Sequence, residues 1–183
     1  MPVFEFDPPQ RFVVGTVGEP GARTFFLQAR GAGRLTSVSL EKAQVAALAE
    51  RVGELLDEIV RRSGGQAPVP ALAAIGSQDN APLDVPIEDE FRVGTMSLAW
   101  DGERDVVVIE CFEVSETDAD PELPVETDPL RNVLRVSLDG GTARAFAQRA
   151  LALVAAGRPP CPFCSGPLDP AGHICPRANG YRR

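Results

Sequence analysis

The chain has little of several residue types on which common catalytic sites depend. It contains one histidine, one tyrosine, one tryptophan and four cysteines, and Lys42 is its only lysine. A single histidine that binds a metal leaves none for a Ser-His-Asp or Cys-His site. The sequence also lacks the glycine-rich loops G-x-x-x-x-G-K-[ST] and G-x-G-x-x-G. It therefore has none of the familiar signatures of triad enzymes or of nucleotide-binding proteins.

Long apolar runs and positive charge are also scarce. No apolar run approaches the ~20 residues that a membrane span needs. The N-terminus, MPVFEFDPPQRF, has acids and prolines where a signal peptide has a basic start and an apolar stretch. A net charge of -8 disfavours wholesale binding of nucleic acids or anionic membranes. We therefore expect a cytoplasmic protein without membrane contact, in which a cysteine cluster binds metal more often than it forms disulfides.

The length and composition of the chain suit one compact domain with a small appendage. The chain has 183 residues, of which 44% are hydrophobic and 24% charged. Two segments recur in the same order in both halves: FVVGTV at 12–17 resembles FRVGTM at 91–96, and VSLEKAQVAALAER at 38–51 resembles VSLDGGTARAFAQR at 136–149. This pattern indicates an internal duplication.

Each half is predicted to form three strands followed by a helix. The first half has strands RFVVGTV, RTFFLQAR and LTSVSL, then a helix from about Leu40 to Arg62, with Ser39 as its N-cap and Gly64-Gly65 at its end. The second half has strands EFRVGTMSLAW, DVVVIECFEV and NVLRVSL. Its helix runs from about Gly141 to Ala156, with inward side chains at Phe146, Ala147, Ala150, Leu151 and Val154.

The predicted fold class is α+β: two tandem β-β-β-α units with a largely antiparallel sheet and two packed helices, plus a small C-terminal zinc ribbon. The body spans residues 1–157, with units at about 1–65 and 90–157, and the ribbon spans 158–183. Residues 63–89 are predicted to be irregular. Residues 115–132 are predicted to be an acidic, solvated insertion. The alternative there is a magnesium or calcium site formed by Asp118, Asp120 and Glu122, although the spacing does not match a calcium loop.

The segment CPFCSGPLDPAGHICP, residues 161–176, concentrates three of the cysteines and the histidine. Cys161 and Cys164 form a C-x2-C pair, and His173 and Cys175 form an H-x-C pair. Three sulfurs and one imidazole are a common ligand set for tetrahedral Zn²⁺, and four protein ligands leave no open position for catalysis. The predicted metal ligands are therefore Cys161, Cys164, His173 and Cys175, and the predicted cofactor is structural zinc.

Three other uses of these residues remain open. CPFC resembles a redox dithiol, although too little chain follows it for a thioredoxin-like fold. Disulfides would need Cys111 as the fourth partner and an oxidising compartment. A catalytic zinc would need one of the four residues to be replaced by water. Cys111 itself lies in a strand and is expected to be a small buried hydrophobe.

Both ends of the chain resemble one family. The start, FEFDPPQRFVVGTVGEPGARTFFLQA, and the end, PPCPFCSGPLDPAGHICPRANGYRR, are similar to DUF3090, an uncharacterised family found in actinobacteria. The resemblance implies that the C-x2-C and H-x-C pairs act as a unit. It also implies gene neighbours that are a histidine-phosphatase-like protein and a protein resembling phosphoinositide kinases. It implies no activity and no catalytic residue.

The function that we expect is a non-catalytic zinc-ribbon protein that acts as an interaction or scaffold module. Its expected partner is a protein, such as the kinase-like or phosphatase-like protein encoded nearby. One alternative is an enzyme that acts on a phosphorylated or small-molecule substrate through carboxylates and arginines. Another is nucleic-acid binding through a basic and aromatic ribbon surface, formed by Arg158, Phe163, Arg177, Tyr181, Arg182 and Arg183.

Overall fold

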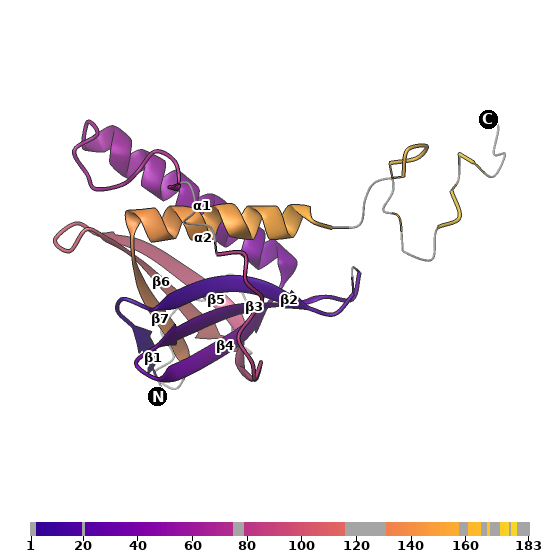
Figure 1. Cartoon of the computed structure of the whole chain (residues 1–183), viewed down its shortest axis with the longest axis horizontal. Helices are drawn as coiled ribbons and strands as arrows, with labels where there is room; N and C mark the ends of the chain where they lie inside the picture. Colours follow the sequence, from indigo (N-terminus) through magenta and orange to yellow (C-terminus); the bar gives the residue numbers. More distant parts are fainter. Residues whose placement is uncertain are drawn as a thin grey trace.

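The computed structural model describes residues 3–19, 21–74, 79–115, 131–157, 161–165, 168, 173–175 and 177–178. This part of the chain contains seven strands and two helices (Figure 1). In chain order they are β1 (Val3–Phe6), β2 (Arg11–Val17), β3 (Thr24–Gly31), β4 (Arg34–Leu40), α1 (Lys42–Arg62), β5 (Asp89–Asp101), β6 (Val106–Glu113), β7 (Val133–Asp139) and α2 (Gly140–Ala155). Neither helix combines the length and the apolarity that crossing a bilayer requires.

All seven strands belong to one sheet, in the order β1-β7-β6-β5-β4-β3-β2. Four neighbouring pairs are antiparallel, and the pairs β1/β7 and β4/β5 are parallel. The register between β4 and β5 shifts, because Ser37 lies opposite Asp89 while Ser39 lies opposite Arg92. The predicted α+β class with a largely antiparallel sheet is confirmed.

The sheet curls beneath the two helices, which pack against each other (Figure 1). Helix α2 contacts both β2 and β7, which lie toward opposite edges of the sheet, and β1 approaches β3. Because side chains alternate between the two faces of a strand, every second residue points to the helices. These side chains form one continuous core, which includes Phe12, Val14, Leu27, Val38, Val107, Ile109, Leu134 and Val136.

Helix α1 forms where apolar residues recur at helical spacing. Val45, Leu48, Val52 and Leu56 are buried on one face. The N-cap is Glu41, so the prediction of Ser39 was wrong. Ser39 is still part of β4, where its N–H donates to the Asp89 carboxylate at 2.9 Å. The Gln44 side chain instead accepts from the Glu41 N–H at 2.8 Å, as in a capping box.

Helix α2 begins after Asp139, whose side chain accepts from the N–H groups of Gly141 and Thr142, both at 2.9 Å. Its core face carries Ala143, Phe146 and Ala150, and the Phe146 ring stacks on Phe12 with centroids 4.7 Å apart. Leu151 was predicted to point inward but is 41% exposed. It lies about 100° around the helix from Ala150 and therefore leaves the core face.

Strand β1 was not predicted. It has only four residues and precedes Asp7-Pro8-Pro9, a sequence that indicates irregular chain. The structure pairs it in parallel with β7, so that Phe6 lies opposite Val136. Phe6 is buried, and the Arg34 guanidinium lies over its ring at 5.2 Å from the centroid.

Residues 79–84 form a segment, here called the strap, that runs across the outer face of β2 and β3. The side-chain amide of Gln28 donates to the Asp84 carbonyl at 3.0 Å, and its oxygen accepts from the Asp84 N–H at 2.7 Å. Leu83 covers Gly15 so closely that a Cβ at Gly15 would lie 2.5 Å from the Leu83 side chain. Part of the stretch predicted to be irregular is therefore held against the sheet.

Candidate metal centre

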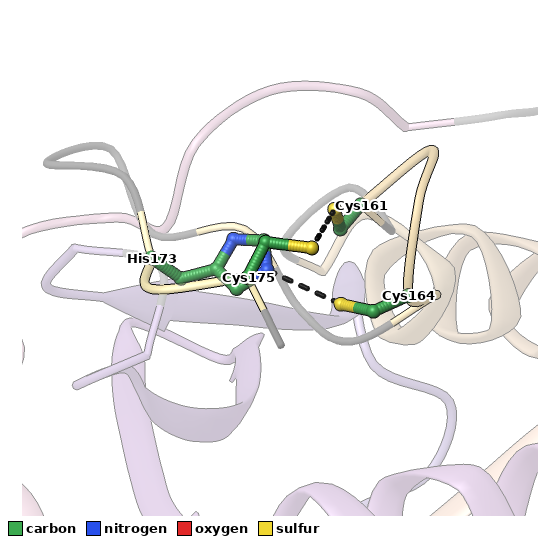
Figure 2. A group of neighbouring side chains, drawn as sticks. All are labelled: Cys161, Cys164, His173 and Cys175. Atoms are coloured by element: carbon green, nitrogen blue, oxygen red, sulfur yellow. Dashed lines mark hydrogen bonds between the residues drawn. The ribbon is translucent and has the colours of Figure 1, made fainter. Parts of the chain in front are cut away.

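Cys161, Cys164, His173 and Cys175 come together beyond the end of α2 (Figure 2). Each offers one ligand atom, and these atoms all lie within 4.8 Å of one another. The sulfurs of Cys161 and Cys175 are 3.8 Å apart, and the Cys164 sulfur is 3.2 Å from Nε2 of His173. The four residues predicted from the sequence form one group that could hold a metal ion.

The distance between the Cys161 and Cys175 sulfurs distinguishes a metal site from a disulfide. A disulfide bond is about 2.05 Å long. Two thiolates that bind one tetrahedral zinc, each at about 2.3 Å, lie about 3.8 Å apart. The observed separation of 3.8 Å matches two thiolates on one metal ion. None of the four cysteines forms a disulfide.

Two turns present the sulfurs of Cys161 and Cys175. In the first, the Ser165 N–H donates to the Cys161 carbonyl at 2.9 Å and the Phe163 N–H donates to the Cys161 sulfur at 3.4 Å. In the second, the Ala178 N–H donates to both the carbonyl and the sulfur of Cys175, at 3.2 and 3.4 Å. N–H groups directed at a sulfur stabilise the thiolate that a metal requires.

The surroundings of Cys161 favour its ionised form. Burial raises the pKa of its thiol, but hydrogen bonds with the backbone of Cys164 and Phe163 and with the side chains of Cys164 and Cys175 together leave the pKa below its usual value. Cys161 and Cys175 are buried, while Cys164 and His173 are half-buried. This environment suits a metal ligand better than an inert core thiol.

Cys111 takes no part in this centre. It lies in β6 and is fully buried in the core of the body. Burial, with a smaller effect of the Glu110 charge, raises the pKa of its thiol to about 12. The prediction that Cys111 is a small buried hydrophobe is confirmed.

Several predicted residues lie outside the described part of the chain. They are the acidic trio Asp118, Asp120 and Glu122, and the C-terminal residues Arg158, Tyr181, Arg182 and Arg183. Of the predicted basic surface, only Phe163 and Arg177 are described. Nη1 of Arg177 donates to the Phe163 carbonyl at 3.0 Å and so links the two turns.

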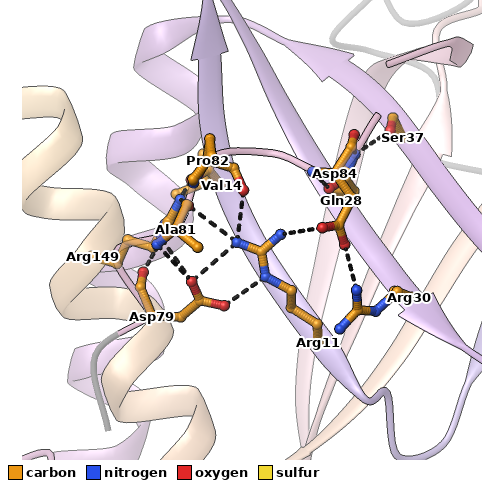
Figure 3. Close-up of polar contacts among 10 residues, drawn as sticks. All are labelled: Arg11, Val14, Gln28, Arg30, Ser37, Asp79, Ala81, Pro82, Asp84 and Arg149. Carbon is orange, nitrogen blue, oxygen red and sulfur yellow. Dashed lines mark hydrogen bonds and ion pairs between the residues drawn. The ribbon is translucent and has the colours of Figure 1, made fainter. Parts of the chain in front are cut away.

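Sequence reasoning missed an arginine–aspartate cluster that fixes the strap (Figure 3). Arg11 donates from Nε to Asp79 at 2.6 Å and from Nη2 to the Pro82 carbonyl at 2.9 Å, and it pairs with Asp84. Arg149 donates from Nε to the Val14 carbonyl at 2.9 Å and pairs with Asp79. The partners come from β2, the strap and α2, so no local sequence pattern could have revealed them.

This cluster borders a pocket of about 370 Å³, lined in part by Arg11, Asp79 and Asp139. The hydrogen bond from Arg11 lowers the pKa of Asp79, and the charges of Arg11 and Arg149 act in the same direction. A carboxylate held ionised by two arginines is a poor general acid or base near neutral pH. The cluster therefore acts as a clamp between the strap, β2 and α2.

The fold and the cysteine–histidine group together define an α+β protein with a C-terminal Cys3His group that could hold a metal. The chain belongs to the family described as protein of unknown function (DUF3090), which it matches over residues 4–175. That match spans the body and includes all four residues of the candidate centre. No curated protein and no solved structure matches the chain.

Proposed function

We propose that this chain is a zinc protein whose Cys3His site is structural and orders a small interaction module. The observation that carries the proposal is the convergence of four ligand atoms within 4.8 Å of one another. Zinc is the metal that best suits three thiolates and one imidazole in a tetrahedron. Four protein ligands would complete its coordination, so the ion would stabilise the fold of residues 158–183 rather than activate a substrate.

Cobalt substitution tests the ligand set. Co²⁺ in a tetrahedral site with three sulfur ligands gives strong visible absorption and thiolate-to-metal charge-transfer bands. Cys161→Ser and Cys175→Ser should each weaken these bands and lower the affinity for the metal. The matched control is Cys111→Ala, because Cys111 is the one cysteine outside the group. Unchanged spectra in both serine variants would overturn the proposal.

The interaction role is supported by the apolar side chains beside the ligands. Phe163 lies between Cys161 and Cys164 and is 62% exposed, while Ile174 lies between His173 and Cys175 and is 82% exposed. An exposed aromatic and an exposed aliphatic side chain on a metal-stabilised segment are typical of a contact surface for another protein. We propose a protein partner in the cytoplasm, specifically the kinase-like or phosphatase-like protein encoded nearby.

Co-purification tests this partner. Tagged wild-type chain should retain one of the two neighbouring gene products, whereas the double variant Phe163→Ala with Ile174→Ala should lose it. Because neither side chain is a ligand, the double variant should bind as much metal as the wild type. Retention of the partner by the double variant would place the contact elsewhere.

We also propose that the body, residues 1–157, consists of two related units at about 1–65 and 90–157. This is supported by the positions of the helices, since α1 begins at Lys42 and α2 at Gly140, 98 residues later. The segments VSLEKAQVAALAER and VSLDGGTARAFAQR differ by the same offset. Both helices follow an antiparallel run of three strands, β2-β3-β4 and β5-β6-β7.

A further inference from the structure

A groove of about 450 Å³ lies between α1 and α2, and none of the cysteine–histidine group lines it. Four small residues line it: Ala49 and Gly53 from α1, Ala147 from α2, and Ala71. Two leucines also line it, and they are unusually exposed for their size: Leu72 is 74% exposed and Leu151 is 41% exposed. The groove is therefore largely apolar yet open to solvent.

Gly53 keeps this groove open. It lies in the interior of a 21-residue helix, where glycine is less favourable than alanine. Core packing does not require glycine here, because no atom beyond its chain neighbours and the nearby backbone of α1 lies within 4 Å of the place that its Cβ would occupy. A side chain at this position would project into the empty space over α1.

The α1 side of the groove is acidic. Glu50, Glu54 and Asp57 recur at helical spacing and all line it. Glu54 and Asp57 remain 63% and 71% exposed, although they pair with Arg51 at 2.8 Å and with Arg144 at 2.7 Å. The whole chain carries a net charge of -8, so a second copy would bring further acidic charge to this face. A complementary occupant is cationic.

Arg144 forms part of the α2 wall of the groove. The residue is 7% exposed; its Nη1 donates to Asp57 at 2.7 Å and its Nε to the Pro70 carbonyl at 3.3 Å. Its Nη2 is buried and has no hydrogen-bond partner among the described residues. The two bonds that Arg144 makes join α2 to α1 and to the chain at Pro70, and so fix this wall of the groove.

We propose that this groove binds a basic amphipathic helix of a partner protein. Ala49 to Asp57 spans about 12 Å along α1, which corresponds to two or three turns of a bound helix. Such a helix would place small or apolar residues at i, i+3, i+4 and i+7 between Leu72 and Leu151. Its lysines or arginines would face Glu50 and Glu54.

A displayed library of helical peptides, about twelve residues long and randomised on one face, is the probe for this groove. Selection against the full-length wild-type chain should enrich peptides with lysine or arginine beside an apolar stripe. Gly53→Leu fills the groove with a good helix former, so it should weaken the selected peptides about tenfold or more while the fold is retained. Gly53→Ala is the matched control with a smaller side chain.

Two further sets of variants test the acidic charge of the groove and the location of the peptide-binding site. Glu50→Gln with Glu54→Gln should weaken the same peptides and reduce the dependence of binding on salt. Cys161→Ser should leave their affinity unchanged, because this groove is distinct from the cysteine–histidine group. Selected peptides without basic residues, or full binding to Gly53→Leu, would overturn the proposal. A wild-type dimer that Gly53→Leu dissociates in sedimentation would also overturn it, since the occupant would then be a second copy.

Discussion

At the scale of single residues, the four cysteines lie in two environments that give their thiols different chemistry. Cys111 is enclosed by the core of the body, where burial opposes ionisation. Cys161 is also buried, but backbone N–H groups point at its sulfur and stabilise the thiolate. Burial alone therefore does not decide which thiol can serve as a metal ligand.

Alkylation followed by mass spectrometry should separate these thiols. In the native protein at neutral pH, Cys111 should stay unmodified, because its pKa of about 12 leaves it protonated and the core excludes the reagent. Cys161, Cys164 and Cys175 should react only after a chelator removes the metal. Rapid modification of Cys111 in the folded protein would contradict the structure of the body.

Asp79 should make the stability of the fold depend on pH. Because Arg11 lowers the folded pKa of Asp79 below the ~3.9 of an unfolded aspartate, its contribution is complete above that value and is lost as the pH falls through the folded pKa. Asp79→Asn should therefore lower the free energy of unfolding at pH 7. The difference from wild type should shrink in acid, as measured by urea denaturation across pH. An equal difference at every pH would argue against the clamp.

At the scale of elements, the strap is held by its own packing as well as by the arginine clamp. Leu83 is 9% exposed and lies over Gly15 of β2. Val13, two residues before Gly15 in the same strand, is 2% exposed. These residues give the outer face of β2 an apolar cover. A side chain at Gly15 would have to displace Leu83.

The contact between Leu83 and Gly15 can be measured with a double-mutant cycle. Gly15→Ala should destabilise the fold by about 1–3 kcal/mol through overpacking. In the Leu83→Ala background, Gly15→Ala should destabilise the fold less, with a coupling energy of about 0.5–3 kcal/mol between the two substitutions. The matched control is Gly53→Ala, which enters open space and should stabilise the fold by about 0.5–1 kcal/mol. Additive effects of Gly15→Ala and Leu83→Ala would show that the strap does not lie over Gly15 in solution.

Local patterns explain which elements could be predicted from the sequence. The six longer strands and both helices carry alternating or helical apolar spacing, and the cysteine–histidine pairs lie within sixteen residues of chain. The features that were missed depend on distant partners. Strand β1 becomes a strand because β7 lies beside it, and Arg11 meets Asp79 across 68 residues of chain. No short window of sequence contains both members of such a pair.

At the scale of the whole molecule, the core and the candidate metal centre are separate. The residues that form or pack against the continuous core range from Phe4 to Val154 and include no ligand residue. The segment that follows Gly157 is short, and a segment of this size rarely orders itself without a metal or a disulfide. The body is therefore expected to fold without the metal.

Chelation tests this separation. Removal of the metal should leave the far-ultraviolet circular dichroism and the thermal transition of the body nearly unchanged. Proteolysis after Arg177 should become faster, because the segment that carries the cysteine–histidine group would lose the proposed metal ion. Cooperative loss of the helical signal together with the metal would show that the two parts fold as one unit.

Elemental analysis of the freshly purified whole chain is the sharpest test of the zinc centre. One zinc ion per chain is expected in the wild type and in Cys111→Ala, with a marked loss of zinc in Cys164→Ser and in the double variant Cys161→Ser with Cys175→Ser. Wild-type protein without stoichiometric zinc, or serine variants that retain a full equivalent, would contradict it.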